Sequence, residues 1–125
     1  MKPMTITVPA REEWALVLRL AVSGVSAVMD VPLDVMEDLC TAVEESADLL
    51  LHQPYAAQAL SLSCEDRPDG LQVVLSAQER TPRQEDQAVD ADIARMILKT
   101  LVREVTLDRD EGGVRSVCLA LPAKG

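Results

Sequence analysis

Residues 33–50 read LDVMEDLCTAVEESADLL and carry the clearest periodic pattern in the chain. Apolar side chains recur at three- and four-residue steps, which predicts one face of an amphipathic helix. That face consists of Leu33, Met36, Cys40, Val43, Ala47 and Leu50. Acidic side chains cover most of the remainder and indicate a solvated face: Asp34, Glu37, Asp38, Glu44, Glu45 and Asp48. Pro54 marks the end of this helix.

The sequence before this helix predicts a strand and a second helix. Residues 5–8 alternate between polar and apolar side chains until Pro9, which indicates a short strand. From Glu12 the period lengthens to that of a helix. Its expected apolar face is Trp14, Val17, Leu18, Ala21, Val25 and Val28.

The sequence after Pro54 predicts two hairpins separated by a helix. Residues 59–64 and 71–75 alternate around an Arg67–Gly70 turn. Residues 78–90 are polar and predict a loop, and residues 91–103 predict a third helix with Ile93, Met96, Ile97 and Leu101 on its apolar side. Residues 105–107 and 114–121 predict two last strands around a turn at 110–113.

The order β-α-α-β-β-α-β-β predicts an α+β fold, in which a single mixed or antiparallel sheet has helices packed on one face. No linker or internal repeat interrupts it, so residues 1–125 are expected to form one domain.

Composition restricts the classes of partner. The net charge is −9, and the chain has one Trp, one Tyr and no Phe. These values disfavour nucleic-acid binding, which needs clustered basic groups and stacking rings. No apolar run reaches the length of a membrane span and no signal peptide opens the chain, so we expect a cytoplasmic protein. Cys40, Cys64 and Cys118 are expected to be free buried thiols, and with His52 alone they suggest no metal site.

Three segments carry a resemblance to a known family: VPAREEW at 8–14, LRLAVSGV at 18–25, and EDL-x-TAV-x-E at 37–45. They resemble the bacterial anti-sigma-factor serine kinases of the RsbW type, members of the histidine-kinase-like (GHKL) ATPase superfamily. The expected element order agrees with that fold over nearly the whole chain.

The resemblance implies a nucleotide site whose ligands have changed. In the family, a Glu-x-x-x-Asn motif supplies a general base and a magnesium ligand. Glu45 occupies the position of the base, but Leu49 stands where the Asn belongs. The adenine-binding Asp-x-Gly-x-Gly motif corresponds to Ala77, Glu79 and Thr81 at its three named positions. The glycine-rich phosphate-binding segment of the family corresponds to residues 92–95, where Asp92 and Ala94 stand at the positions of the glycines.

These changes favour a non-catalytic anti-sigma-factor-like regulator that binds proteins and uses no cofactor or metal. Glu45 is then a remnant of the general base. The resemblance implies three candidate partners: a sigma factor, an anti-anti-sigma protein of the STAS class, and a second copy of the chain.

Two alternatives remain open. One is a divergent active kinase that uses ATP and collects magnesium with Glu44, Glu45 and Asp48. The other is a small-molecule sensor whose vacated pocket is lined by Leu49, Ala77 and Ile93. His52 is interpreted as a solvated or capping residue. Arg80 and Arg83 are interpreted as solvated loop charges, with anion binding as the alternative.

Overall fold

The computed structural model describes residues 3–83 and 90–122. Its elements are β1 (Met4–Pro9), the 3-10 turn η1 (Glu12–Trp14), α1 (Ala15–Val28), α2 (Leu33–Leu51), β2 (Tyr55–Ala56), β3 (Ala59–Arg67), β4 (Gly70–Gln78), β5 (Thr81–Pro82), α3 (Ala91–Leu101), β6 (Glu104–Asp110) and β7 (Gly113–Pro122). The predicted order of the main helices and strands is confirmed.

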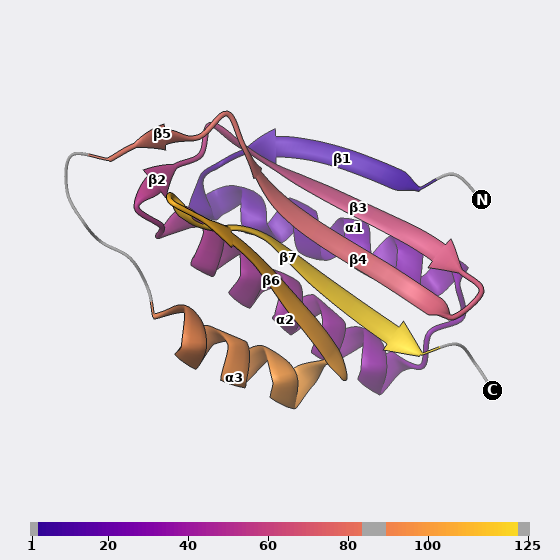
Figure 1. Cartoon of the computed structure of the whole chain (residues 1–125). Coiled ribbons are helices and arrows are strands. Elements are labelled where there is room, and N and C mark those ends of the chain that lie inside the picture. Colours follow the sequence, from indigo (N-terminus) through magenta and orange to yellow (C-terminus); the bar gives the residue numbers. More distant parts are fainter. Residues whose placement is uncertain (1–2, 84–89, 123–125) are drawn as a thin grey trace.

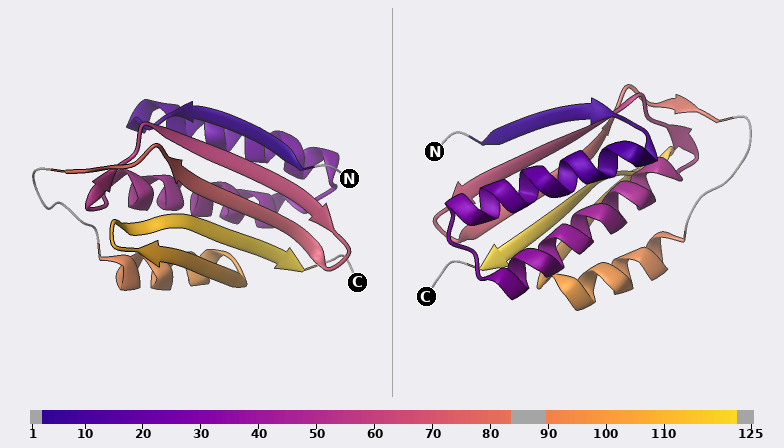
Figure 2. Two further views of the ribbon diagram at one scale, coloured as in Figure 1. Left: turned by 45° about the horizontal axis from the view of Figure 1, so that its top comes forward. Right: turned by 180° about the vertical axis from the view of Figure 1, so that it is seen from behind.

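One five-stranded antiparallel sheet has the order β1-β3-β4-β7-β6. All three helices cover one of its faces, as Figures 1 and 2 show. The predicted α+β fold is therefore confirmed. A separate two-stranded ribbon, β2-β5, was not predicted. It places a strand inside the predicted loop 78–90, of which residues 84–89 lie outside the described part of the chain.

The β3-β4 hairpin follows the predicted turn. Arg67 pairs with Gly70 across it, and Gly70 has a φ of 135°, which an L side chain rarely adopts. Along β3 the side chains alternate regularly between buried and partly exposed. The buried set, led by Leu60 and Leu62, faces the helices and forms the sheet side of the core.

Helix α2 is the central helix of the layer, between α1 and α3 (Figure 2). Its buried surface is wider than one stripe and comprises Leu39, Cys40, Ala42, Val43, Ser46, Ala47, Leu49 and Leu50. Leu33, predicted to face the core, is 66% exposed. Contact with α1, α3 and the sheet explains the wide buried surface, because a helix covered on several sides buries more than one stripe. Leu33 is the first residue of α2 and lies at its exposed end.

Helix α1 turns its central residues to the core. Leu18, Val22 and Ser26 are buried, whereas Trp14 and Val28 are exposed. The prediction that those two terminal residues belong to the core face was therefore wrong. Trp14 lies in the 3-10 turn that precedes the α-helix, and the tighter winding of that turn takes it out of phase with the α-helical positions.

Helix α3 faces the core with a different side from the predicted one. Ala94 and Leu98 are buried. Ile93, Met96 and Ile97 are exposed, so the prediction that they pack inward was wrong. Both sides of the helix are apolar, and periodicity cannot tell which of two apolar sides is buried.

Within the described residues, no helix is long and apolar enough to cross a membrane.

The orientation of α3 can be tested by two substitutions on its opposite sides. We expect Leu98→Ala to lower the free energy of unfolding by about 2–5 kcal/mol, because it opens a cavity in the core. Met96→Ala removes an exposed side chain and is expected to change it by no more than about 0.5 kcal/mol. Urea unfolding followed by circular dichroism measures both. Equal losses in the two variants would contradict this orientation.

Candidate functional site

The C-terminal end of α2, the β2-β5 ribbon and the β6-β7 turn meet at one end of the molecule (Figure 1). Gln53 joins them, although it is 3% exposed. Its Nε2 donates to the carbonyl of Leu49 at 2.8 Å, and its Oε1 accepts from the amide of Val114 at 2.8 Å. A Cβ at Gly113 would collide with Gln53. Sequence reasoning missed Gln53, because no local pattern pairs it with Val114.

Arg83 completes the carbonyl end of α2. Its guanidinium donates to the carbonyl of Leu51 at 2.6 Å and to that of Gln53 at 2.7 Å. The backbone amide of Arg83 donates to the carbonyl of Pro54. Arg83 is exposed, as its interpretation as a solvated charge expected, but it also binds these carbonyls, whose negative dipole ends favour a cation there.

Arg80 is also held by the protein. It forms a bidentate pair with Asp110 at 2.6 and 2.9 Å, lies 5.4 Å from the centre of the Tyr55 ring, and has a 13% exposed side chain. Asp110 also accepts from the amide of Gly112. The Arg80 hydrogen bond is the main cause that lowers the pKa of Asp110 to about 2. Arg80 is therefore neither a solvated loop charge nor a free anion-binding group.

Two of the acids of α2 have separate partners. Glu44 pairs with Arg19 of α1 at 2.8 Å, and Asp48 lies beside His52. Glu45 is partly buried on the same helix. Within the described residues, Glu44, Glu45 and Asp48 do not form a group spaced for one metal ion. Leu49, at the position of the family's Asn, is 1% exposed and belongs to the core.

The segment at the family's adenine motif keeps one unusual backbone position. Ala77 is a partly buried residue of β4 and pairs with Leu60. Glu79 follows with a φ of 53°, in the left-handed region that glycine adopts most easily. Thr81 is exposed in β5. A side chain thus stands where the resemblance implies glycine, while the backbone has a glycine-like conformation.

The N-terminus of α3 is capped by the chain itself. The Asp90 side chain accepts from the amides of Asp92 at 2.9 Å and of Ile93 at 3.3 Å. Asp92 adds a second carboxylate to the first turn of α3, and this carboxylate accepts a hydrogen bond from the Arg109 guanidinium at 3.2 Å. Amides at a helix N-terminus are the groups that cradle a phosphate. Here a carboxylate already accepts from two of them.

Of four cavities lined by residues in the described part of the chain, none is lined by Leu49, Ala77 or Ile93. Leu49 is in the core and Ile93 is 57% exposed. The structure therefore does not show the apolar pocket that the sensor alternative expects these residues to line.

The three cysteines are free, as predicted. Cys40 and Cys64 are buried, and burial raises the pKa of the Cys64 thiol to about 11. Cys118 is only partly buried and accepts from Gln72 at 3.3 Å, so the prediction of full burial was wrong for this residue.

The Arg80–Asp110 pair predicts a pH dependence. Because the folded-state pKa of Asp110 is about 2, below the ordinary value, its stabilising contribution is present above about pH 4 and is lost as the pH falls toward 2. We expect Asp110→Asn to be less stable than the wild type at pH 6, with the difference closing by pH 2. Urea midpoints across this range measure it. Asp69→Asn, in the exposed β3-β4 turn, is the control and should show no such closing difference.

Glu79 offers a test of the retained backbone conformation. The left-handed region costs a side-chain-bearing residue about 1–2 kcal/mol, and glycine at position 79 would remove this cost. Part of the resulting gain in stability is offset, because glycine makes the unfolded chain more flexible. We therefore expect Glu79→Gly to raise the free energy of unfolding by about 0.5–1 kcal/mol. The neighbouring Gln78→Gly should lower it, because Gln78 is in the strand β4. A destabilised Glu79→Gly variant would contradict the expectation.

No protein-family model and no curated protein matches the sequence. Among solved structures, the chain is similar to the crystal structure of the RsbU and RsbW domains of Rv1364c from Mycobacterium tuberculosis, with a TM-score of 0.72 and 15% sequence identity. The match covers 95% of this chain and 32% of that one, so the chain spans about a third of the length of the structure it matches. At this identity the similarity concerns the fold, and it supports the RsbW-like fold that the sequence predicted.

Proposed function

We propose that the chain is a regulatory protein of the anti-sigma-factor type, which binds another protein and does not transfer phosphate. The observation that carries the proposal is the exposed apolar side of α3. The RsbW-like fold supports the regulatory class. The proposed partners are a sigma factor or a STAS-class anti-anti-sigma protein, with a second copy of the chain as a further candidate. We also propose that residues 1–125 act as one cytoplasmic domain.

The exposed side of α3 comprises Ile93, Met96 and Ile97, which are 57%, 70% and 42% exposed. Their i, i+3, i+4 spacing makes them neighbours on the helix surface. The core side of the same helix is already occupied by Ala94 and Leu98. Leaving a second apolar side in water costs free energy that a partner would recover on binding, and contiguous exposed apolar surface marks interaction sites.

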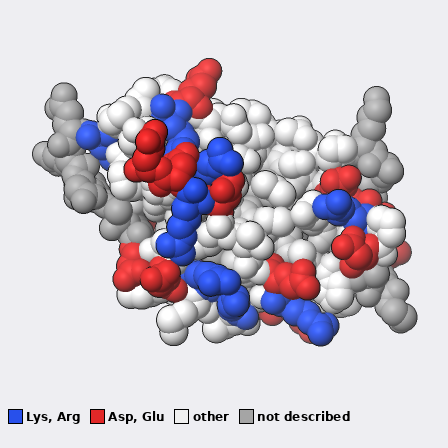
Figure 3. All heavy atoms as spheres, in the orientation of Figure 1, with Lys and Arg blue, Asp and Glu red and all other residues white. Residues whose placement is uncertain are grey.

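Charge beside this surface indicates the chemistry of the partner. Arg95 and Lys99 are exposed on α3, and Lys99 lies one turn after Met96. Figure 3 shows both basic and acidic side chains along the edge where Figure 1 places α3. The exposed pair Arg95 and Lys99 is a basic feature on a chain of net charge −9. It favours a partner whose apolar surface is bordered by acids, because opposite charges guide association.

The residues that stand at the family's ATP-binding positions support the proposal that this chain does not transfer phosphate. Leu49 cannot bind magnesium and is buried in the core. Asp90 accepts from two amides at the N-terminus of α3, and Asp92 adds a second carboxylate there. A triphosphate would have to displace the Asp90 carboxylate and approach that of Asp92, so the local negative charge opposes triphosphate binding.

The proposal is tested by two binding measurements on the purified chain. Titration with Mg-ATP in a calorimeter is expected to give no binding heat. Titration with the sigma factors and STAS-domain proteins of the same organism is expected to give a complex with one of them. Met96→Asp should weaken that complex at least tenfold, because it places a charge in the buried contact.

Val28→Asp is the matched control, since Val28 is an 83% exposed apolar residue on a different helix. Its affinity for the partner should remain at the wild-type value. Micromolar binding of Mg-ATP together with phosphate transfer to a STAS protein would contradict the proposal and favour the active kinase. Equal loss of binding in both variants would remove α3 as the contact surface.

A further inference from the structure

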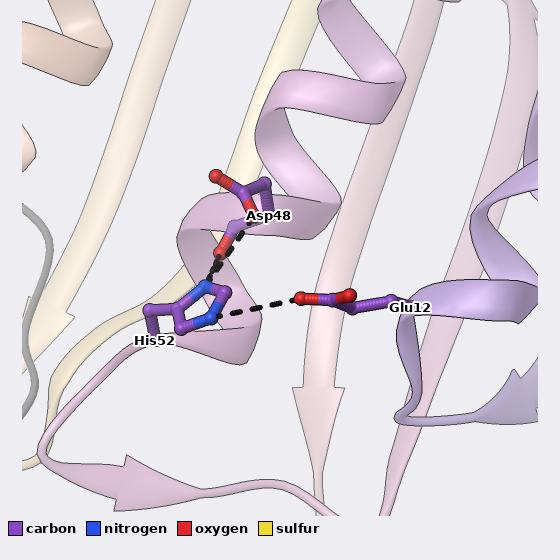
Figure 4. Close-up of side chains that lie close together, drawn as sticks. All are labelled: Glu12, Asp48 and His52. Atoms are coloured by element: carbon purple, nitrogen blue, oxygen red, sulfur yellow. Dashed lines mark hydrogen bonds and ion pairs between the residues drawn. The ribbon is translucent and has the colours of Figure 1, made fainter.

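His52 is brought together with two carboxylates that lie far from one another in the sequence (Figure 4). His52 is the C-cap residue of α2, Asp48 lies one turn earlier on that helix, and Glu12 begins the turn η1 after strand β1. One ligand atom from each of the three lies within 4.8 Å of the others. The capping interpretation of His52 is confirmed, but nothing in the sequence spacing indicated its proximity to Glu12.

Hydrogen bonding fixes which nitrogen of His52 is free. Nδ1 lies 2.8 Å from the backbone carbonyl of Asp48. A carbonyl only accepts hydrogen bonds, so Nδ1 must carry the proton of that bond. In the neutral ring, Nε2 then has an unprotonated lone pair. A histidine whose Nδ1 donates to a backbone carbonyl presents Nε2 as a metal ligand, a common arrangement in metal sites.

The free nitrogen faces an acceptor. Figure 4 shows Nε2 directed toward the carboxylate of Glu12, with 3.9 Å between Nε2 and Oε1. This distance is too long for a hydrogen bond. A tetrahedral zinc ion with bonds of about 2.0–2.2 Å would hold these two atoms about 3.3–3.6 Å apart, so a small movement of the exposed Glu12 side chain would bring both atoms to one ion. A cation shared between the two atoms, either a proton on Nε2 or a metal ion, makes this contact attractive.

We propose that Glu12 and Nε2 of His52 form a zinc-binding site, in which Asp48 holds the opposite ring nitrogen: its carboxylate lies 3.4 Å from Nδ1. An imidazole with a carboxylate suits zinc and related late transition metals, whereas magnesium prefers oxygen ligands alone. The side chains of Glu12, Asp48 and His52 are 79%, 59% and 34% exposed, so the ion reaches the site from solvent and keeps water as a remaining ligand.

Two basic residues line the adjoining cavity of about 240 Å³ together with Glu12 and His52: Arg11 and Arg83. Both have other partners. Arg11 pairs with Glu13 at 3.1 Å, and Arg83 donates to the carbonyls that end α2. The carboxylate of Glu12 therefore remains available to an ion. A bound ion would join the start of the α1 segment to the end of α2.

The experiment is calorimetric titration of the full chain with Zn²⁺ in a buffer that does not chelate it. We expect one ion to bind per chain and to raise the melting temperature. His52→Ala and Glu12→Gln should each weaken binding at least tenfold and abolish the thermal shift. Glu12→Gln alters an exposed side chain outside the core, so it keeps the test valid if His52→Ala disturbs the helix end.

Glu13→Gln is the matched control, because Glu13 is the neighbouring acid in η1 and lies outside the cluster. Cys118→Ser controls for zinc held by the partly exposed thiol. Both variants should bind zinc as the wild type does. Absence of zinc binding would overturn the proposal, as would wild-type affinity in Glu12→Gln or loss of binding in Cys118→Ser.

Discussion

The carbonyl end of helix α2 is the constraint on which this end of the molecule depends. The last carbonyls of a helix have no partners within it, and leaving them unpaired in a packed structure costs free energy. Here side chains supply the donors: His52 to Asp48, Gln53 to Leu49, and Arg83 to Leu51. Since α2 is the central helix of the layer, these donors also fix the strands and loops that carry them. The buried amide of Gln53 extends the arrangement to β7, and Arg83 extends it to the segment after β5.

Much of the fold was predictable because it rests on local signals. The hairpin turns, the order of elements and the acidic exposed side of α2 follow from periodicity and turn residues within short windows. The inward side of α3 was not predictable. Ile93, Met96 and Ile97 form a stronger apolar pattern than Ala94 and Leu98, and only the packing of the helix against α2 and β6 determines which set is buried.

The candidate site was less predictable, since its contacts join residues far apart in the chain. Arg80 and Asp110 are separated by 30 positions, as are Arg83 and Gln53. Neither pair has a sequence signature, so the arginines were interpreted as loop charges. Glu79 shows the opposite case. Its sequence position suggested a lost glycine, and only the φ of 53° shows that the glycine-like conformation is still there. Side-chain identity and backbone conformation at this segment therefore have to be read separately.

The two proposed binding sites lie on opposite sides of α2 in the helix layer. The hydrogen bond from His52 to the Asp48 carbonyl both satisfies the helix end and presents Nε2 toward Glu12, on the side of α2 where α1 begins. The exposed apolar side of α3 belongs to the helix on the other side of α2 (Figure 2). The direct route for coupling between zinc and a protein partner is α2, which contacts both α1 and α3 and whose buried residues belong to the core. A rigid central helix transmits no signal unless it has a second arrangement to adopt. The two binding events are therefore best treated as independent, and an effect of zinc on partner affinity would indicate a second position of α2.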